Sequence, residues 1–124
     1  MKIGIDYYNC ITQYPDRFRE LARALMIGGM EVIILSAVGE RQLKKHGDLE
    51  AYENEILSYE IPHTKLIIVH FDDDKAIPQL KHKAIIENGI EVMIDDRPET
   101  IAVLHAAGIT ALQVPKPLKK KLLS

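Results

Sequence analysis

This chain of 124 residues has no tryptophan and a single cysteine, Cys10. One cysteine cannot form an internal disulfide, so we expect a reducing compartment and a cytoplasmic protein. No apolar run approaches the roughly 20 residues that a membrane-spanning helix needs, and the first apolar run is too short for a secretion signal. Secreted, disulfide-rich and membrane-spanning classes are therefore disfavoured.

Sequence motifs for several common ligands are also missing. No G-x-G-x-x-G follows the first apolar run and no G-x-x-x-x-G-K-[ST] occurs, so the dinucleotide fingerprint and the phosphate-binding loop are both absent. The five histidines show no metal-ligand spacing, which argues against zinc. Sixteen Lys and Arg against eighteen Asp and Glu give a formal net charge of −2. Such a chain has no overall attraction for nucleic acid or for a membrane surface, so a ligand must be recognised at a local site.

The sequence does contain a regular alternation of short apolar runs and longer amphipathic segments. The runs are rich in Val, Ile and Leu and predict strands buried on both faces, as in a parallel sheet. They cover residues 3–5, 31–35, 65–69, 92–94 and 110–114. Helical spacing predicts a helix between each pair of strands, the first with Asp16 as its N-cap, and Pro78 and Pro98 open the last two.

This order predicts an α/β fold, a three-layer sandwich with a five-stranded, mainly parallel sheet. The length predicts one domain, over residues 1–114, followed by a tail rich in Lys and Pro over residues 115–124. Residues 37–64 have room for one or two helices and not for a separate cap domain. A site on this fold is therefore expected to be open.

Polar residues follow the predicted strands: Asp6, Ser36, His70 and the pair Asp95–Asp96. Ligands of open parallel sheets bind at the carboxyl ends of the strands, so these side chains are candidates for a common site. Crowded carboxylates are tolerated when a divalent cation lies between them, and Mg²⁺ prefers such oxygen ligands. Each residue alone could instead be a helix cap or a turn residue, because Asp and Ser are common in both.

The same positions resemble the motifs of the haloacid dehalogenase-like superfamily. The run IGID followed by Ile11-Thr12 resembles its first motif, in which a strand ends at a nucleophilic Asp. The run VIILS is similar to its second motif, Lys81 is placed like its third-motif lysine, and IDDRPE resembles its fourth, acidic motif. The resemblance extends in order from residue 3 to about residue 113.

This resemblance implies a Mg²⁺-dependent hydrolase that acts on a phosphate monoester. Asp6 would be the nucleophile and would form an aspartyl-phosphate, while Ser36 and Lys81 would bind the phosphoryl group. Asp6, Asp95 and Asp96, together with the backbone carbonyl of Tyr8, would bind the metal. Lys83 is an alternative to Lys81, which we prefer for its spacing from Gly89.

Tyr8 departs from the family pattern. Most phosphatases of the superfamily have a second Asp at this position, two residues after the nucleophile, as general acid and base. Losing such a group typically costs about 10²–10⁴-fold in rate, so Tyr8 predicts a slow enzyme or one with altered proton transfer. The alternative is a catalytically silent module on the same fold that binds phosphate, metal or another protein. The dehalogenase branch of the superfamily also has an Asp-x-Tyr first motif. Those enzymes close a helical cap over a small substrate, and this chain has no room for one.

An open site requires a large substrate or a partner subunit to exclude water. We therefore expect a phosphorylated substrate of unidentified class, macromolecular or covered by a second subunit, and no membrane partner. Lysines of the tail (Lys116, Lys119, Lys120 and Lys121) are able to contact a nucleic-acid backbone, although the acidic balance elsewhere favours a solvated tail.

Overall fold

The computed structural model describes residues 1–116, so most of the predicted tail lies outside the described residues. The described residues form five strands: β1 (Lys2–Ile5), β2 (Glu31–Gly39), β3 (Lys65–Phe71), β4 (Val92–Asp95) and β5 (Thr110–Gln113). The helices are α1 (Pro15–Ile27), α2 (Glu40–His46), α3 (Leu49–Ser58), α4 (Ile77–Asn88) and α5 (Pro98–Ala106), with short helical turns η1 (Tyr7–Ile11) and η2 (Asp74–Ala76). Within these residues no helix has both the length and the apolar character needed to cross a membrane.

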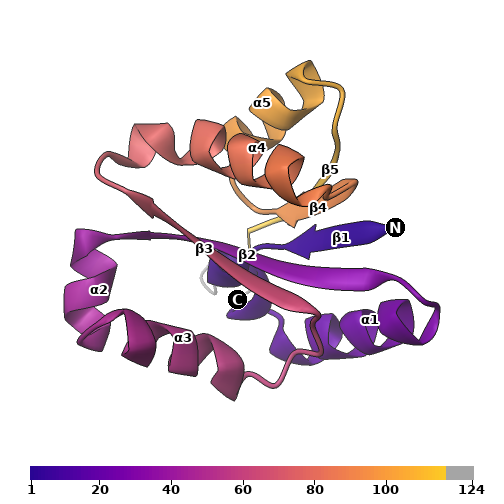
Figure 1. Ribbon diagram of the computed structural model, residues 1–124, viewed down its shortest axis with the longest axis horizontal. Helices are drawn as coiled ribbons and strands as arrows, with labels where there is room; N and C mark the ends of the chain where they lie inside the picture. Colours follow the sequence, from indigo (N-terminus) through magenta and orange to yellow (C-terminus); the bar gives the residue numbers. More distant parts are fainter. Residues whose placement is uncertain (117–124) are drawn as a thin grey trace, which may run out of the picture.

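The five strands form one all-parallel sheet in the order β3-β2-β1-β4-β5. Helices α4 and α5 cover one face, and α1, α2 and α3 cover the other (Figure 1). The predicted α/β class, with five strands and three layers, is confirmed. The chain runs from β1 outward to β3 and then crosses to β4 on the other side of β1. The strand order therefore reverses between β1 and β4, which is where such sheets bind ligands.

Helix ends follow local chemistry. Pro15 and Pro98 open α1 and α5, where the missing N–H of proline costs no hydrogen bond. Gly89 ends α4 in the left-handed conformation, with φ of 65°. The prediction that Asp16 caps α1 is wrong: Tyr14 occupies the cap position, and the Asp16 carboxylate lies inside the first turn. There it accepts a hydrogen bond from Arg19 at 2.8 Å.

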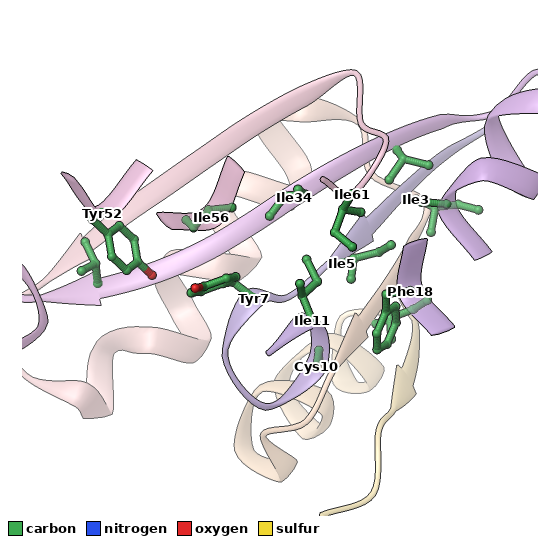
Figure 2. Packing of buried hydrophobic residues seen from close by; sticks show 14 residues of the cluster. Ile3, Ile5, Tyr7, Cys10, Ile11, Phe18, Ile34, Tyr52, Ile56 and Ile61 are labelled. Atoms are coloured by element: carbon green, nitrogen blue, oxygen red, sulfur yellow. The ribbon is translucent and has the colours of Figure 1, made fainter. Parts of the chain in front are cut away.

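Side chains alternate between two buried clusters, one on each face of the sheet. Ile3 and Ile5 of β1 and Ile34 of β2 pack toward α1 and α3 (Figure 2). Ile33 and Leu35 of β2 pack on the opposite face, toward α4 and α5. This alternation is the period-two geometry of a strand, and it determines which face each following polar residue occupies.

Strand β2 continues to Gly39, four residues beyond the predicted end at residue 35. Its extension pairs with β3, with Ser36 opposite Ile68 and Gly39 opposite Phe71. The prediction that Ser36 ends the strand is therefore wrong. Two helices, α2 and α3, occupy the chain between β2 and β3.

Candidate functional site

Asp6 and Asp95 lie side by side at the carboxyl ends of β1 and β4. Ile5 pairs with Ile94, and the Asp6 N–H donates to the Ile94 carbonyl at 2.9 Å. Ile5 and Ile94 both face the cluster that packs against α1 and α3. The residue that follows each of them therefore faces α4. The strand register therefore places both carboxylates on the same face of the sheet.

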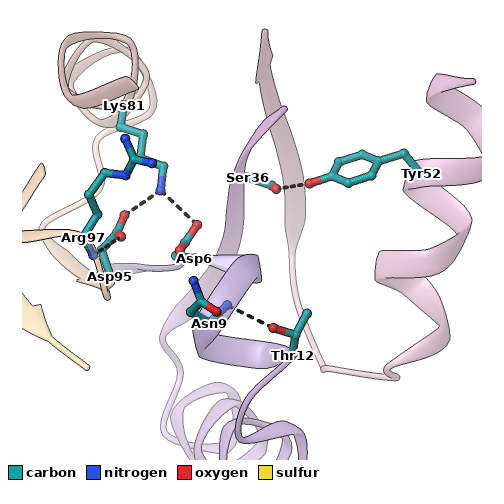
Figure 3. A network of polar contacts seen from close by, with 8 residues as sticks. All are labelled: Asp6, Asn9, Thr12, Ser36, Tyr52, Lys81, Asp95 and Arg97. Carbon is teal, nitrogen blue, oxygen red and sulfur yellow. Dashed lines mark hydrogen bonds and ion pairs between the residues drawn. The ribbon is translucent and has the colours of Figure 1, made fainter. Parts of the chain in front are cut away.

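Lys81 on α4 joins these two carboxylates. Its Nζ lies 2.9 Å from Asp6 Oδ1 and 2.6 Å from Asp95 Oδ2 (Figure 3). All three side chains are buried, and the Arg97 N–H donates to the other oxygen of Asp95 at 3.0 Å. Lys83 has a side chain that is 73% exposed and pairs with Glu87. Between the two candidate lysines, the structure thus places Lys81 at the carboxylates.

Asp96 adds a third carboxylate close to Asp6. Ligand atoms of Asp6, Cys10 and Asp96 lie within 4.8 Å of one another. Burial raises the pKa of the Cys10 thiol well above its usual range, and the neighbouring carboxylates raise it further. Cys10 therefore stays a neutral thiol, and the oxygen donors of this group come from Asp6 and Asp96.

Burial is also the main cause of a raised pKa at Asp6. The pKa rises from 3.8 to about 8, because desolvation outweighs the favourable charge of Lys81 and because Asp95 adds a negative neighbour. For Lys81, burial acts to lower the pKa, but Asp6 and Asp95 raise it above its usual value. The lysine therefore stays charged.

The charges of this cluster fit a divalent cation. The cluster contains three buried carboxylates and one buried lysine, which contacts two of them, so with every group ionised the cluster is negative overall. A cation between Asp6 and Asp96 would compensate the excess, and carboxylate oxygens are the donors that Mg²⁺ prefers. Asp95 is engaged by Lys81 and by the Arg97 N–H, so it supports the site more than it offers free oxygens. The carbonyl of Tyr8 as a further ligand stays a prediction.

An open pocket of about 960 Å³ lies above the cluster. Asp6, Lys81, Asp95 and Asp96 line its floor, and Tyr8 lines it as well. Its rim carries charges of both signs, from Arg41 and Lys45 of α2, Arg97 and the acidic residues 72–74. The space is several times larger than a phosphate group needs.

The structure does not bring Ser36 to this pocket. Ser36 lies two residues after Ile34 in β2, so its side chain points to the same face of the sheet. This is the α3 face, away from Asp6 and Lys81 (Figure 3). There its Oγ lies 2.5 Å from the Tyr52 hydroxyl, and the residue is fully buried. The orientation of Ser36 follows from the alternation of side chains along β2. It could have been predicted from the sequence only if the strand had been known to continue beyond residue 35.

The Tyr8 side chain is placed by residues that the sequence did not single out. Its hydroxyl lies 3.3 Å from Nε2 of His46, the last residue of α2. Nδ1 of His46 lies 3.1 Å from Oε2 of Glu55 on α3. Burial raises the pKa of the Tyr8 phenol. His70, the other predicted strand-end residue, is exposed and does not line the pocket.

Comparison with known proteins gives a fold and no family. No protein-family model and no curated protein sequence matches the chain. A chain of the Pnkp1/Rnl/Hen1 complex has a similar fold, with a TM-score of 0.68 and 15% identity over 95% of this chain. A chain of the Pnkp1/Rnl/Hen1 RNA repair complex is also similar, with a TM-score of 0.66 and 16% identity over 93% of this chain.

The likeness covers 47% and 42% of those two chains, so the present chain spans less than half of their length. At such low identity it establishes the architecture alone. A shared fold does not imply a shared function, which depends on the residues of the pocket.

Proposed function

We propose that the chain is a Mg²⁺-dependent phosphohydrolase of the haloacid dehalogenase-like type that acts on a phosphate monoester. The observation that carries this proposal is the bridge of Lys81 between Asp6 and Asp95 on the floor of an open pocket. A carboxylate, a cation and further acidic ligands at one point are what a phosphoryl-transfer site requires. The order of the motifs along the chain supports the same class.

In this proposal Asp6 is the nucleophile. Lys81 binds Asp6 Oδ1, which leaves Oδ2 to attack phosphorus. The bond between phosphorus and the leaving oxygen breaks, and that oxygen takes the electron pair. Water then attacks the phosphorus of the aspartyl-phosphate and releases inorganic phosphate and free Asp6.

Lys81 holds the nucleophile in place and adds positive charge beside the phosphoryl oxygens. Asp96 and Asp6 would hold Mg²⁺, which supplies charge neutralisation of the phosphoryl group when bound. Asp95 fixes Lys81. Ser36 has no part in this assignment, because its hydroxyl faces Tyr52.

The width of the pocket favours a substrate larger than a free sugar phosphate. The pocket is open to solvent, so either the substrate or a second subunit would exclude water from the reacting groups. The fold similarity to chains of an RNA repair complex adds phosphorylated nucleic-acid ends to the candidates. Phosphoproteins and small phosphate esters remain alternatives that one assay separates.

The test is Mg²⁺-dependent phosphate release from four substrate classes: sugar phosphates, nucleotides, phosphopeptides and oligonucleotides with a terminal phosphate. We expect release from at least one class, abolished by Asp6→Asn and by chelation of the metal. Asp72→Asn, on the pocket rim, is the matched control and should stay active. If Asp6→Asn matches the unmodified protein on every substrate, Asp6 is not the nucleophile.

A second candidate function is a non-catalytic module that binds phosphate or metal. It is favoured by Tyr8, whose phenol replaces the second carboxylate of active phosphatases and contacts His46 instead. Calorimetric titration with Mg²⁺ and inorganic phosphate would then show binding without turnover on any substrate. Tyr8→Asp separates the two candidates further, because restored activity would locate the defect in proton transfer alone.

A further inference from the structure

The pocket extends beyond the carboxylate cluster, along a part of the sheet that only β2 and β3 form (Figure 1). Ile5 pairs with Ile34 of β2, so Asp6 is about level with the next residue of β2. Phe71, at the end of β3, pairs with Gly39, four residues further along β2. At about 3.3 Å per residue this is about 13 Å along the strands. We call this projecting part, residues 36–39 and 68–71, the β2–β3 ledge.

Phe71 brings an aromatic ring to the pocket from the β2–β3 ledge. It lies two residues after Val69, which packs with the cluster under α4, so its ring is on the same face of the sheet as Lys81. A Cβ atom at position 39 would lie 2.7 Å from Cε2 of Phe71, so the ring packs against the backbone of Gly39. Phe71 is half-buried and belongs to neither of the two buried clusters that the described residues form. The ring is therefore available to stack on a ligand.

Two cations of α2 line the same pocket. Arg41 and Lys45 are exposed and lie four residues apart, so they share one face of the helix. Their helix begins at Glu40, directly after the glycine on which the Phe71 ring packs. Within residues 1–116 neither cation forms an ion pair. The pocket thus has two uncompensated positive charges in addition to the lysine that binds the carboxylates.

The loop that follows β3 makes another part of the rim acidic. Asp72, Asp73 and Asp74 line the pocket and are exposed. Asp73 has a local structural role, because its carboxylate accepts a hydrogen bond from the Lys75 N–H at 3.0 Å. The loop repels a polyanion, so an anionic chain bound at the carboxylate cluster is expected to leave the pocket along α2.

We propose that the β2–β3 ledge and α2 bind a single-stranded nucleic acid whose terminal phosphate is hydrolysed at Asp6. This inference rests on the proposed function, because it names the class of substrate that reacts there. Arg41 and Lys45 contact phosphates of the strand, and Phe71 stacks on a base. Positive charge combined with an aromatic ring is the arrangement by which proteins bind single strands without reading their sequence.

Size and charge distinguish this substrate from the alternatives. In one nucleotide six covalent bonds separate phosphorus from the base, a span of at most about 9 Å at about 1.5 Å per bond. The β2–β3 ledge reaches about 13 Å beyond Asp6, so Phe71 and Arg41 are left to a later nucleotide of the strand. A sugar phosphate offers neither a second phosphate nor a base. A phosphopeptide has no repeating negative charge for Arg41 and Lys45 to bind.

The first test measures binding of a fluorescent single-stranded oligonucleotide with a terminal phosphate, by anisotropy and without divalent cations. Every protein sample carries Asp6→Asn, so that the phosphate is not removed. Lys45→Gln should lower the slope of log K against log salt by about 0.7, the contribution of one phosphate contact to a single strand. Adding Arg41→Gln should lower it by about as much again, and the two together should weaken binding at least tenfold. The matched control is Lys44→Gln, which removes an exposed charge of the same helix outside the pocket and should leave the slope unchanged.

The ring of Phe71 is tested in the same assay. Phe71→Leu should weaken binding at least about fivefold without changing the salt slope, because base stacking contributes affinity and no counterion release. Phe71→Tyr keeps an aromatic ring and should retain the affinity. An equal loss in both variants would show that Phe71 only packs on Gly39 and does not stack on a base.

The second test varies the length of the substrate. With the unmodified protein and Mg²⁺, kcat/KM for phosphate release should rise at least tenfold from a mononucleotide to an oligonucleotide with the same terminal phosphate. The advantage of the longer substrate should be lost when Arg41→Gln and Lys45→Gln are combined. If phosphate esters are hydrolysed and length has no effect, the nucleic-acid subsite is wrong and the hydrolase stands.

Two further outcomes separate the substrate class from the chemistry. A phosphopeptide with basic residues that binds more tightly than the oligonucleotide, and that Asp72→Asn weakens, would identify a phosphoprotein and overturn the nucleic-acid proposal. An oligonucleotide that binds with the expected salt slopes, in a protein that hydrolyses no phosphate ester, would support the subsite and overturn the hydrolase.

Discussion

The two faces of the sheet bury polar groups in different ways. On the α4 face, Lys81 meets Asp6 and Asp95, and all three groups are charged or titratable. On the α3 face, Ser36 and Tyr52 bury a pair of neutral hydroxyls that satisfy each other at 2.5 Å. Both arrangements are almost inaccessible to solvent, yet only the first lines the pocket.

The difference shows how burial distinguishes a functional cluster from a structural one. Two hydroxyls that share a hydrogen bond are both partnered and carry no charge that needs compensation. Three buried carboxylates with one lysine leave negative charge uncompensated when all are ionised, and burial, with Asp95 as a negative neighbour, raises the pKa of Asp6. A buried group that its own neighbours do not satisfy has capacity for a ligand.

The largest expected decrease in the free energy of unfolding comes from removing the charge of Lys81 on the α4 face. Lys81→Met leaves Asp6 and Asp95 buried without their common partner, and breaking a buried ion pair costs about 3–5 kcal/mol. We expect the free energy of unfolding at pH 7.5, measured with denaturant in the absence of metal, to fall by about this amount. Lys83→Met on the exposed side of the same helix is the control and should cost less than about 1 kcal/mol. Equal losses in both variants would contradict the placement of Lys81.

A second effect is a dependence of stability on pH that arises at Asp6. The pKa of Asp6 is 3.8 in the unfolded chain and about 8 in the fold, so between these values the folded protein holds an additional proton. Its contribution to stability is therefore complete below pH 3.8 and is lost as the pH rises toward 8.

Asp6→Asn should remove this dependence in the metal-free protein. We expect little change at pH 4 and a gain on the order of 5 kcal/mol at pH 8, since the pKa rises from 3.8 to about 8 and one pKa unit corresponds to about 1.4 kcal/mol. Unfolding with denaturant at both pH values measures this difference. Mg²⁺ should stabilise the unmodified protein and not the variant. A variant that is destabilised at pH 8 would show that Asp6 is compensated without a metal.

Changes to the neutral Ser36–Tyr52 pair on the α3 face should lower the free energy of unfolding less and should not affect the pocket. Ser36→Ala leaves the Tyr52 hydroxyl buried without its partner, which costs about 1–2 kcal/mol. Adding Tyr52→Phe removes the orphaned hydroxyl, so the double variant should lose less than the sum of the two single variants. The Michaelis constant for a phosphate ester should not change. A large increase in that constant for Ser36→Ala would instead support Ser36 as a phosphate ligand.

The smallest effect serves as a reference for both faces. Glu20 and Arg23 form a salt bridge of 2.6 Å on the exposed side of α1, as short as the contact between Lys81 and Asp95. Because both side chains are more than half exposed, Glu20→Ala should cost less than about 0.5 kcal/mol. Equilibrium unfolding under the conditions used for Lys81→Met compares them directly. A cost similar to that of Lys81→Met would mean that burial is not what distinguishes the two pairs.

Much of this architecture follows from patterns within single segments. Continuous apolar runs predicted all five strands, and the acidic residues after β1 and β4 were correctly expected to share one edge of the sheet. That expectation succeeds because parallel strands bring their carboxyl ends together, whatever the packing details. Lys81 was singled out from the family resemblance and from its spacing to Gly89, and the structure places its Nζ between Asp6 and Asp95.

Features that depend on packing between segments were not predictable in the same way. The end of β2 was placed too early because Ser36 follows an apolar run, whereas pairing with β3 extends the strand to Gly39. The contact of His46 with Tyr8 and Glu55 depends on how α2 folds back on α3. That turn is made at Gly47, where φ is 114°, a conformation that favours glycine. No periodicity within either helix reveals which side chains then meet.

The position of Lys81 in the chain bears on how the protein folds. Its contact with Asp95 spans 14 residues, whereas its contact with Asp6 spans 75. The shorter loop closes at a lower entropic cost, so α4 and β4 can form a neutral pair before β1 docks beside them. The docking of β1 then brings a second carboxylate to a lysine that is already paired. At neutral pH this last step therefore has to desolvate the Asp6 carboxylate, and a divalent cation present during folding should offset that cost and accelerate the step.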